Sequence, residues 1–233
     1  MTYEVEETRR GYRLNQNGSV LSEMLAFPGA TNSVFDFLAA LTAIFAPQGR
    51  MALLGFAGGG MIAPLRKAGA VTAVDGVDLD APGHELFHRI SKTWAGEVAF
   101  AREDAVDWLR RQQPEFDVVV EDLSVPTEDD VVKPAVSLTR LPDLIRARLR
   151  PGGVVVTNML KPRGTVWRDF MPAFASGHRS CLVVHLREFE NRLMVAGDFD
   201  GSARRLSLWL KRILNRIGSD QADQFYVRRF VGS

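Results

Sequence analysis

The sequence predicts an α/β protein with a mostly parallel sheet and helices on both faces. From residue 51 to residue 197, short apolar runs that suit strands alternate with segments of helical composition. A glycine-rich turn, residues 55–60, follows the first of these runs directly. Acidic side chains follow the next strands, as Asp78, Asp104 and Asp122. Ligands of such sheets bind at the carboxyl ends of the strands, so the three acids indicate a binding site there.

The composition narrows the class of protein. With 233 residues, 46% of them hydrophobic, the chain can bury a full core. A formal net charge of +1 gives no indication of a nucleic-acid partner. The one cysteine, Cys181, fits a reducing compartment, so we expect a soluble cytoplasmic protein. No apolar run approaches the ~20 residues of a membrane span, and the acidic N-terminus lacks a signal-peptide core.

Residues 1–30 are expected to form an N-terminal β-hairpin region. Asn17-Gly18 separates two partly alternating runs, and this dipeptide favours a tight hairpin turn because both positions tolerate a positive φ. A nucleoside-binding α/β domain is expected over residues 31–200. Its first helix should begin near residues 31–33, Thr-Asn-Ser, any of which can cap it, and end near Phe45.

The predicted domain then alternates strands and helices. We expect parallel strands over residues 51–54, 71–79, 97–101, 116–121 and 154–159. We expect helices over residues 61–67, 82–94, 104–113, 133–149 and 165–176. An antiparallel pair, residues 180–188 and 191–197, completes a predicted seven-stranded sheet.

The segment 201–233 has a different character. Residues 204–217 form an amphipathic helical pattern with five basic residues and no acid. We favour an interpretation in which the apolar stripe docks on the body of the protein or on a partner subunit of a homodimer. Binding to an anionic membrane surface or to nucleic acid is the alternative. The apolar stripe consists of Leu206, Leu210, Ile213 and Ile217. Residues 224–231 are compatible with one more strand.

Four segments carry a family resemblance. They read Leu54-Gly-Phe-Ala-Gly-Gly-Gly60, Asp78-Leu-Asp80, Glu103-Asp-Ala-Val-Asp-Trp108 and Asp117-Val-Val-Val-Glu-Asp-Leu-Ser-Val-Pro126. In order, they resemble the I-G-G-G-D-G-G, E-I-D, G-D-(G/A)-x-x-(F/W) and D-V-I-I-x-D-S-S-D-P segments of the spermidine synthase family. About half of the chain is similar to that family, which has the Rossmann-like fold of class I S-adenosylmethionine-dependent methyltransferases.

The resemblance implies a transferase that uses S-adenosylmethionine or decarboxylated S-adenosylmethionine as donor and needs no metal. Asp78, with Leu79 beside it, would hold the ribose hydroxyls of the donor, and Asp104 with Ala105 would contact its adenine. Asp122 would touch the donor and would position and deprotonate the attacking group of a small-molecule acceptor such as an amine. The loop beneath the methionine-derived part of the donor would consist of Gly55, Phe56, Ala57, Gly58 and Gly59.

Two positions depart from the family pattern. Gly58 and Val125 stand where the family has aspartates, and a cationic diamine needs carboxylates to replace its water. The acidic run 128–130 is either a source of that charge or a solvated loop. Three functions stay open: aminopropyl transfer, methyl transfer to an unknown acceptor, and a non-catalytic nucleoside-binding or interaction module.

Two other motifs would indicate a dinucleotide site and a zinc site, and the sequence disfavours both. Gly55-x-Ala57-x-x-Gly60 is a degenerate dinucleotide fingerprint, but a dinucleotide site does not require Asp104 or Asp122. Residues 84–88 read His-Glu-Leu-Phe-His, which is the pattern of a zinc protease, yet no third histidine follows at a usual ligand spacing.

Overall fold

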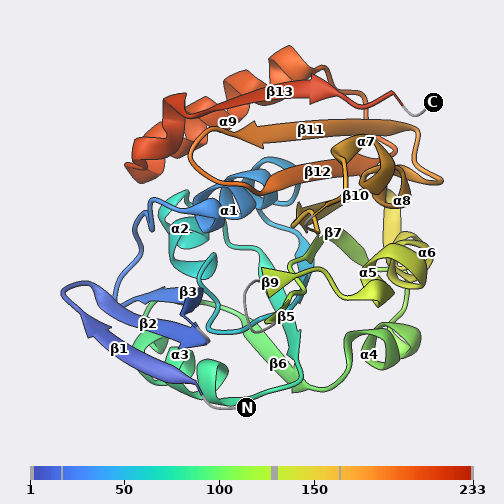
Figure 1. Cartoon of the computed structure of the whole chain (residues 1–233). Coiled ribbons are helices and arrows are strands. Elements are labelled where there is room, and N and C mark those ends of the chain that lie inside the picture. Colours follow the sequence, from blue (N-terminus) through green and yellow to red (C-terminus); the bar gives the residue numbers. More distant parts are fainter. Residues whose placement is uncertain (1–2, 17, 127–130, 163, 232–233) are drawn as a thin grey trace.

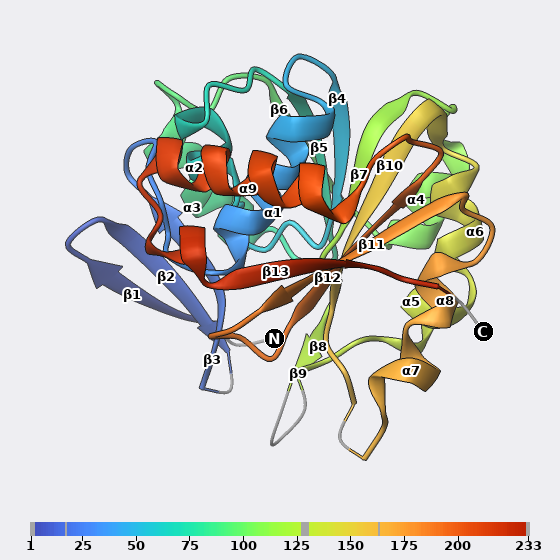
Figure 2. The same cartoon turned by 90° about the horizontal axis from the view of Figure 1, so that it is seen from above.

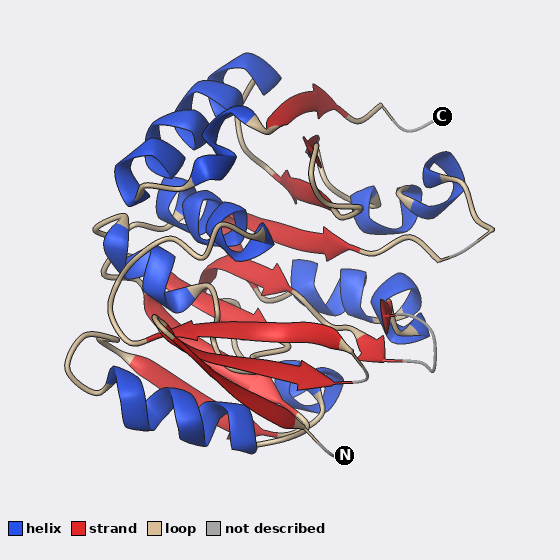
Figure 3. Ribbon diagram, turned by 60° about the vertical axis from the view of Figure 1, so that its left-hand side comes forward, coloured by secondary structure: helices blue, strands red, loops and turns tan. Residues whose placement is uncertain are grey.

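The computed structural model describes residues 3–16, 18–126, 131–162 and 164–231, and over these residues it contains a central eight-stranded sheet covered by helices on both faces (Figures 1 and 3). The strand order is β13-β11-β12-β10-β7-β4-β5-β6. These strands are β4 (Arg50–Leu54), β5 (Ala73–Asp78), β6 (Val98–Arg102), β7 (Phe116–Glu121), β10 (Leu149–Met159), β11 (Ser180–Leu186), β12 (Arg192–Gly197) and β13 (Phe225–Arg229). The five strands from β10 to β6 are parallel to one another. On the other edge, β12 pairs antiparallel with β10, β11 with β12, and β13 with β11.

The expected fold class is confirmed, with one strand more than the seven predicted. The additional strand is β13, which pairs with β11 from Phe225 opposite Leu186 to Arg229 opposite Leu182. β10 also begins at Leu149, five residues before the predicted start. Pro151, Gly152 and Gly153 fall inside this strand, and its register against β7 shifts between Leu149 and Val154.

The helices match the expected positions, but two of them are divided. The helices are α1 (Val34–Phe45), α2 (Ile62–Lys67), α3 (Pro82–Ser91), α4 (Ala105–Arg111), α5 (Ala135–Thr139), α6 (Leu141–Arg146), α7 (Trp167–Phe170), α8 (Pro172–Ala175) and α9 (Ala203–Ile217), with the 3-10 helix η1 (Asp220–Asp223). The predicted helices 133–149 and 165–176 each form two short helices. Pro142 and Pro172 lie in the first turn of the second helix of each pair, because proline suits a helix start and interrupts a helix interior.

A separate three-stranded antiparallel sheet precedes the domain, formed by β1 (Glu4–Thr8), β2 (Gly11–Gln16) and β3 (Ser19–Leu25). The predicted hairpin is confirmed as β2–β3, and β1 is an additional strand. Gly18 in the turn has a φ of 76°, whereas Asn17 lies outside the described residues. A second small hairpin, β8 (Val125–Pro126) with β9 (Val131–Val132), was not expected. The acidic run 128–130 also lies outside the described residues.

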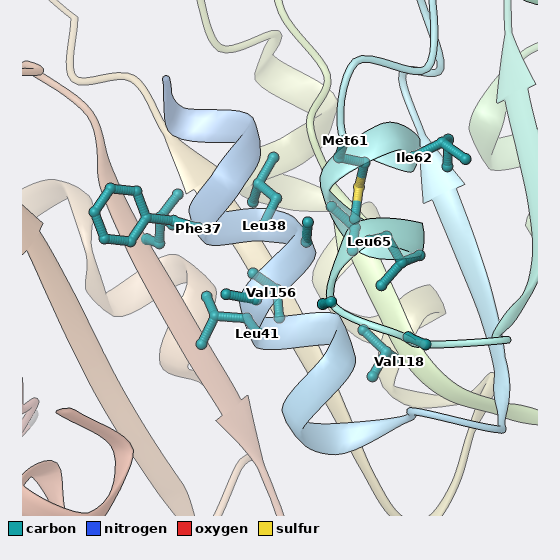
Figure 4. Close-up of a cluster of buried hydrophobic side chains, with 14 of the residues drawn as sticks. Phe37, Leu38, Leu41, Met61, Ile62, Leu65, Val118 and Val156 are labelled. Atoms are coloured by element: carbon teal, nitrogen blue, oxygen red, sulfur yellow. The ribbon is translucent and has the colours of Figure 1, made fainter. Parts of the chain in front are cut away.

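The core has two halves, one on each face of the sheet, because successive strand residues point to opposite sides. Met51 and Leu53 of β4 pack with α1, α2 and α9, whereas Ala52 and Leu54 pack with α4 and α6. Figure 4 shows the first half, where side chains of α1 and α2 meet Val118 and Val156 of the sheet.

Helix α9 covers the outer side of α1 and α2 (Figure 2). Its buried stripe is Leu206, Leu210, Leu214 and Ile217, so docking on the body of the protein is confirmed. Leu214 occupies the place expected for Ile213, which is partly buried. No helix among the described residues has the length and apolar character that crossing a membrane requires.

The buried carboxylate of Asp36 fastens the C-terminal segment to the start of α1. Asp36 accepts hydrogen bonds from the backbone and hydroxyl of Thr31, each at 2.8 Å, and from the Ser219 hydroxyl at 2.6 Å. Asp36 is 0% exposed, and these donors replace the water that it loses.

Candidate active site

A cavity of about 520 Å³ lies at the carboxyl ends of the parallel strands. Its volume falls within the ~300–1,000 Å³ usual for small-molecule sites. Seven predicted site residues from four successive strand ends and the loops after them line it together: Gly55, Ala57, Asp78, Leu79, Asp104, Ala105 and Asp122. The N-terminal sheet contributes Leu14, Gln16 and Val20 to another part of the wall.

Asp78, at the end of β5, is bound to the glycine loop. The backbone N–H of Ala57 donates to Asp78 Oδ2 at 2.7 Å, and the N–H of Asp80 donates to Oδ1 at 3.3 Å. Burial raises the pKa of Asp78, although these backbone donors oppose the shift. The carboxylate therefore holds the loop and lines the cavity at the same time.

The glycine loop turns in a backbone conformation that side chains rarely adopt. Gly55 has a φ of 86°, and a Cβ there would lie 2.7 Å from the backbone oxygen of Asp122. A Cβ on Gly58 would lie 2.7 Å from the Met24 sulfur of β3. Phe56 is 2% exposed and packs edge-on against Phe87. Three loop residues proposed as ligand contacts, Phe56, Gly58 and Gly59, are therefore not part of the cavity lining and instead pack the loop against its neighbours.

Ala57 has a φ of 46°, a left-handed conformation that costs a non-glycine residue roughly 1–2 kcal/mol. Ala57→Gly is therefore expected to raise the free energy of unfolding by about 1 kcal/mol, measured by urea denaturation. Ala101→Gly in β6 is the matched control and should instead lose about 0.5–1 kcal/mol. A destabilised Ala57→Gly protein would contradict this account of the loop.

Asp104 caps helix α4. Its Oδ1 accepts hydrogen bonds from the backbone N–H of Val106 at 2.9 Å and of Asp107 at 3.2 Å. Asp104 and Ala105 both line the cavity, so the cap and the start of helix α4 form part of its wall.

Asp122 begins a relay of hydrogen bonds that crosses two further strands. The amide nitrogen of Asn158 on β10 donates to Asp122 Oδ1 at 2.7 Å. The amide nitrogen of Asn191, just before β12, donates to Asn158 Oδ1 at 2.9 Å. Burial raises the pKa of Asp122 to about 6, while the charge of Lys133 and the bond from Asn158 lower it. A carboxylate with such a pKa is a better base near neutral pH than an ordinary aspartate.

Glu121 points away from the cavity that Asp122 lines, because successive strand residues point to opposite faces of the sheet. Its carboxylate accepts from Lys133 Nζ at 2.7 and 2.8 Å and from the Ser137 hydroxyl at 3.0 Å. Lys133 Nζ also donates to the backbone oxygen of Leu123 at 2.8 Å. The side chains of Glu121 and Lys133 are only 2% and 0% exposed. This buried ion pair, together with the bond from Lys133 to Leu123, holds the segment after Asp122 in place.

Several polar lining residues were missed from the sequence. Asn158 lies near the end of the predicted strand 154–159, so the strand-end rule that identified the acids could also have found it. Gln16 and Asn191 carried no such signal, because they come from a hairpin and from the start of an antiparallel strand.

The His84–His88 pair has an aromatic environment. The two rings lie 6.1 Å apart, and the His84 ring stacks on Phe100 at 4.1 Å. Across the described part of the chain, no three histidine, cysteine, aspartate or glutamate residues group closely enough to hold a metal ion.

Comparisons with solved structures identify the fold. The structure is similar to a probable spermidine synthase from Corynebacterium glutamicum, with a TM-score of 0.72 and 17% identity over 96% of this chain and 86% of that one. Spermidine synthase from Thermotoga maritima gives a TM-score of 0.63 and 11% identity over 93% and 84%. Human methyltransferase-like protein 13, solved with S-adenosylhomocysteine (SAH), gives 0.61 and 13% over 78% and 90%. The sequence matches no protein-family model and no curated protein.

These likenesses define the Rossmann-like fold of S-adenosylmethionine-dependent methyltransferases. More narrowly, the fold is spermidine synthase-like, since both spermidine synthases align over more than nine-tenths of the chain.

Proposed function

We propose that this chain is a spermidine synthase-like transferase that takes S-adenosylmethionine or its decarboxylated form as donor. The observation that carries the proposal is the meeting of Asp78, Asp104 and Asp122, from three different strand ends, at one cavity. Carboxylates suit both halves of such a donor, because they accept hydrogen bonds from ribose hydroxyls and attract a sulfonium cation.

The transfer reaction requires only two contributions from the protein. When the donor is bound, its sulfonium supplies a carbon that is already activated for displacement. The protein then needs to align the acceptor and remove a proton, without forming a covalent intermediate. Asp122 is suited to that proton transfer because its pKa is raised to about 6 and its orientation is held by Asn158.

Methyl transfer is the second candidate, and Val125 favours it. Val125 lines the cavity three residues after Asp122 and offers no charge to an amine. An assay that supplies both donors together with putrescine separates the two reactions. Aminopropyl transfer would produce 5′-methylthioadenosine, whereas methyl transfer would produce S-adenosylhomocysteine. Tight donor binding with neither product would mean either that putrescine is not the acceptor or that the chain is a non-catalytic module.

Donor binding can be measured without turnover. At a concentration 100 times the Kd, a ligand that binds the native state alone adds about 2.7 kcal/mol, which corresponds to a rise in Tm of about 5–10 °C for a chain of this size. We expect this rise with S-adenosylmethionine or 5′-methylthioadenosine, and Asp78→Ala should abolish it.

The control for that variant is Asp143→Ala, whose side chain is 75% exposed on α6 and which should keep the shift. A shift with a nicotinamide dinucleotide alone would replace the proposal with an oxidoreductase. A shift with none of these compounds would favour an interaction module.

A further inference from the structure

We infer that the acceptor is a primary amine on an apolar chain, with a single positive charge, in place of a diamine. This inference rests on the proposed function and names the substrate class of the same site. It depends on how charge is distributed along the cavity wall.

The strand order divides the cavity into two sides. β4 lies in the middle, with β5 and β6 on one side and β7, β10 and β12 on the other. Of the five carboxylates that line the cavity among the described residues, four lie at the ends of β5 and β6 or just after them: Asp78, Asp80, Glu103 and Asp104. On the other side, Asp122 is the one carboxylate in the described part of the wall, and the next two strands contribute the neutral amides Asn158 and Asn191.

The carboxylate of Asp122 provides the charge for one cation. Asn158 occupies Asp122 Oδ1, and Asn191 in turn occupies Asn158 Oδ1. The other oxygen, Asp122 Oδ2, can accept an N–H donor from an ammonium, and the single negative charge of the carboxylate balances one such cation. Among the described residues, a second ammonium deeper on this side would meet amides and hydrocarbon, and burying a charge without a counter-charge is costly.

Hydrocarbon forms most of the remaining wall on this side. It comes from the loop and hairpin after β7, from α5, from the end of β10 and from the turn before β12. Its members are Leu123, Val125, Val136, Leu160 and Phe189. Such a wall suits an alkyl chain, which gains about 0.8 kcal/mol for each buried CH₂ group.

The transfer step balances with these groups alone. The bound ammonium gives one proton to Asp122, which frees the nitrogen lone pair. That pair forms a bond to the donor carbon as the carbon–sulfur bond breaks, and the electrons of the broken bond leave with sulfur as a neutral thioether. The product is a secondary ammonium, and the proton on Asp122 passes to water.

A pair of isosteric amines tests the inference. n-Pentylamine and putrescine differ only in a terminal methyl group in place of a second ammonium. Calorimetric titration of the native chain, with and without 5′-methylthioadenosine, should show pentylamine binding at least tenfold more tightly than putrescine. Equal or tighter binding of putrescine would overturn the inference, and so would the failure of pentylamine to bind.

A matched pair of variants tests the wall itself. Val125→Asp places a carboxylate on the apolar side and should move the preference at least tenfold toward putrescine. Val71→Asp, at a position 69% exposed and outside the cavity lining, should leave both affinities unchanged. An unchanged preference in Val125→Asp would refute the role of Val125.

Binding of the donor and binding of the amine are measured separately. If 5′-methylthioadenosine binds and pentylamine does not, the acceptor inference is wrong and the donor proposal stands. If pentylamine binds and no adenosyl compound does, the donor proposal is wrong and the single-cation character of this side of the cavity is supported.

Discussion

Replacing Asp122 by asparagine is expected to lower the transfer rate by about 10²–10⁴-fold, the usual contribution of a positioned general base. Donor affinity should change far less, because Asp78 and Asp104 stay in place. The amide keeps the shape of the side chain but cannot take a proton. Product formation under saturating donor is the measurement, with Asp200→Asn, whose side chain is 97% exposed, as the control.

The substitution Asp122→Asn should also change how the transfer rate depends on pH. In the native chain the rate should rise with pH through about 6, where Asp122 loses its proton, and this limb should be absent in Asp122→Asn. The contribution of Asp122 to the free energy of unfolding changes with pH in the opposite sense to the rate. Because the folded pKa lies above the ordinary 3.8, the contribution of this carboxyl is present at low pH and is lost as the pH rises from 3.8 to about 6. A rate that is independent of pH across this range would remove Asp122 from the role of base.

Lys133→Met is expected to lower the free energy of unfolding by about 3–5 kcal/mol, as measured by urea denaturation. The substitution leaves the carboxylate of Glu121 buried without its cation. It should also raise the pKa of Asp122 further, since the charge of Lys133 holds that pKa down. The acid limb of the rate profile should then move to higher pH.

The double variant Glu121→Gln with Lys133→Met separates charge from packing. Glutamine keeps an acceptor for Ser137, which bonds Glu121 in the native chain, and carries no charge that needs a partner. We expect most of the lost stability to return in the double variant. A Lys133→Met protein as stable as the native chain would show that the buried pair contributes little.

Much of the fold follows from local pattern. The apolar runs at β4 and β7 and the acids after them predicted the parallel strands and the edge where the cavity lies. The same rule placed Asp78, Asp104 and Asp122 around one cavity, because parallel strands bring their carboxyl ends together. These features depend on contacts close in the sequence or on a repeating period.

The features that were missed depend on distant partners. Lys133 pairs with Glu121 across 12 positions, and Asn191 reaches Asn158 across 33. The local pattern indicated a strand within residues 224–231, but it could not show that this strand, β13, pairs with β11. The resemblance places Phe56 in the donor-binding loop, and the structure shows that its ring points toward Phe87 and does not line the cavity. Sequence position alone could not show that direction.

The bond between Ser219 and Asp36 joins groups that are 183 residues apart in the chain. At a synthesis rate of about 5–20 residues per second, roughly 10–40 s separate the appearance of Asp36 on the ribosome from that of its partner. Helix α9, which covers α1, is also translated near the end of that interval. The nascent chain therefore carries the apolar side of α1 without the cover of α9 for most of that interval.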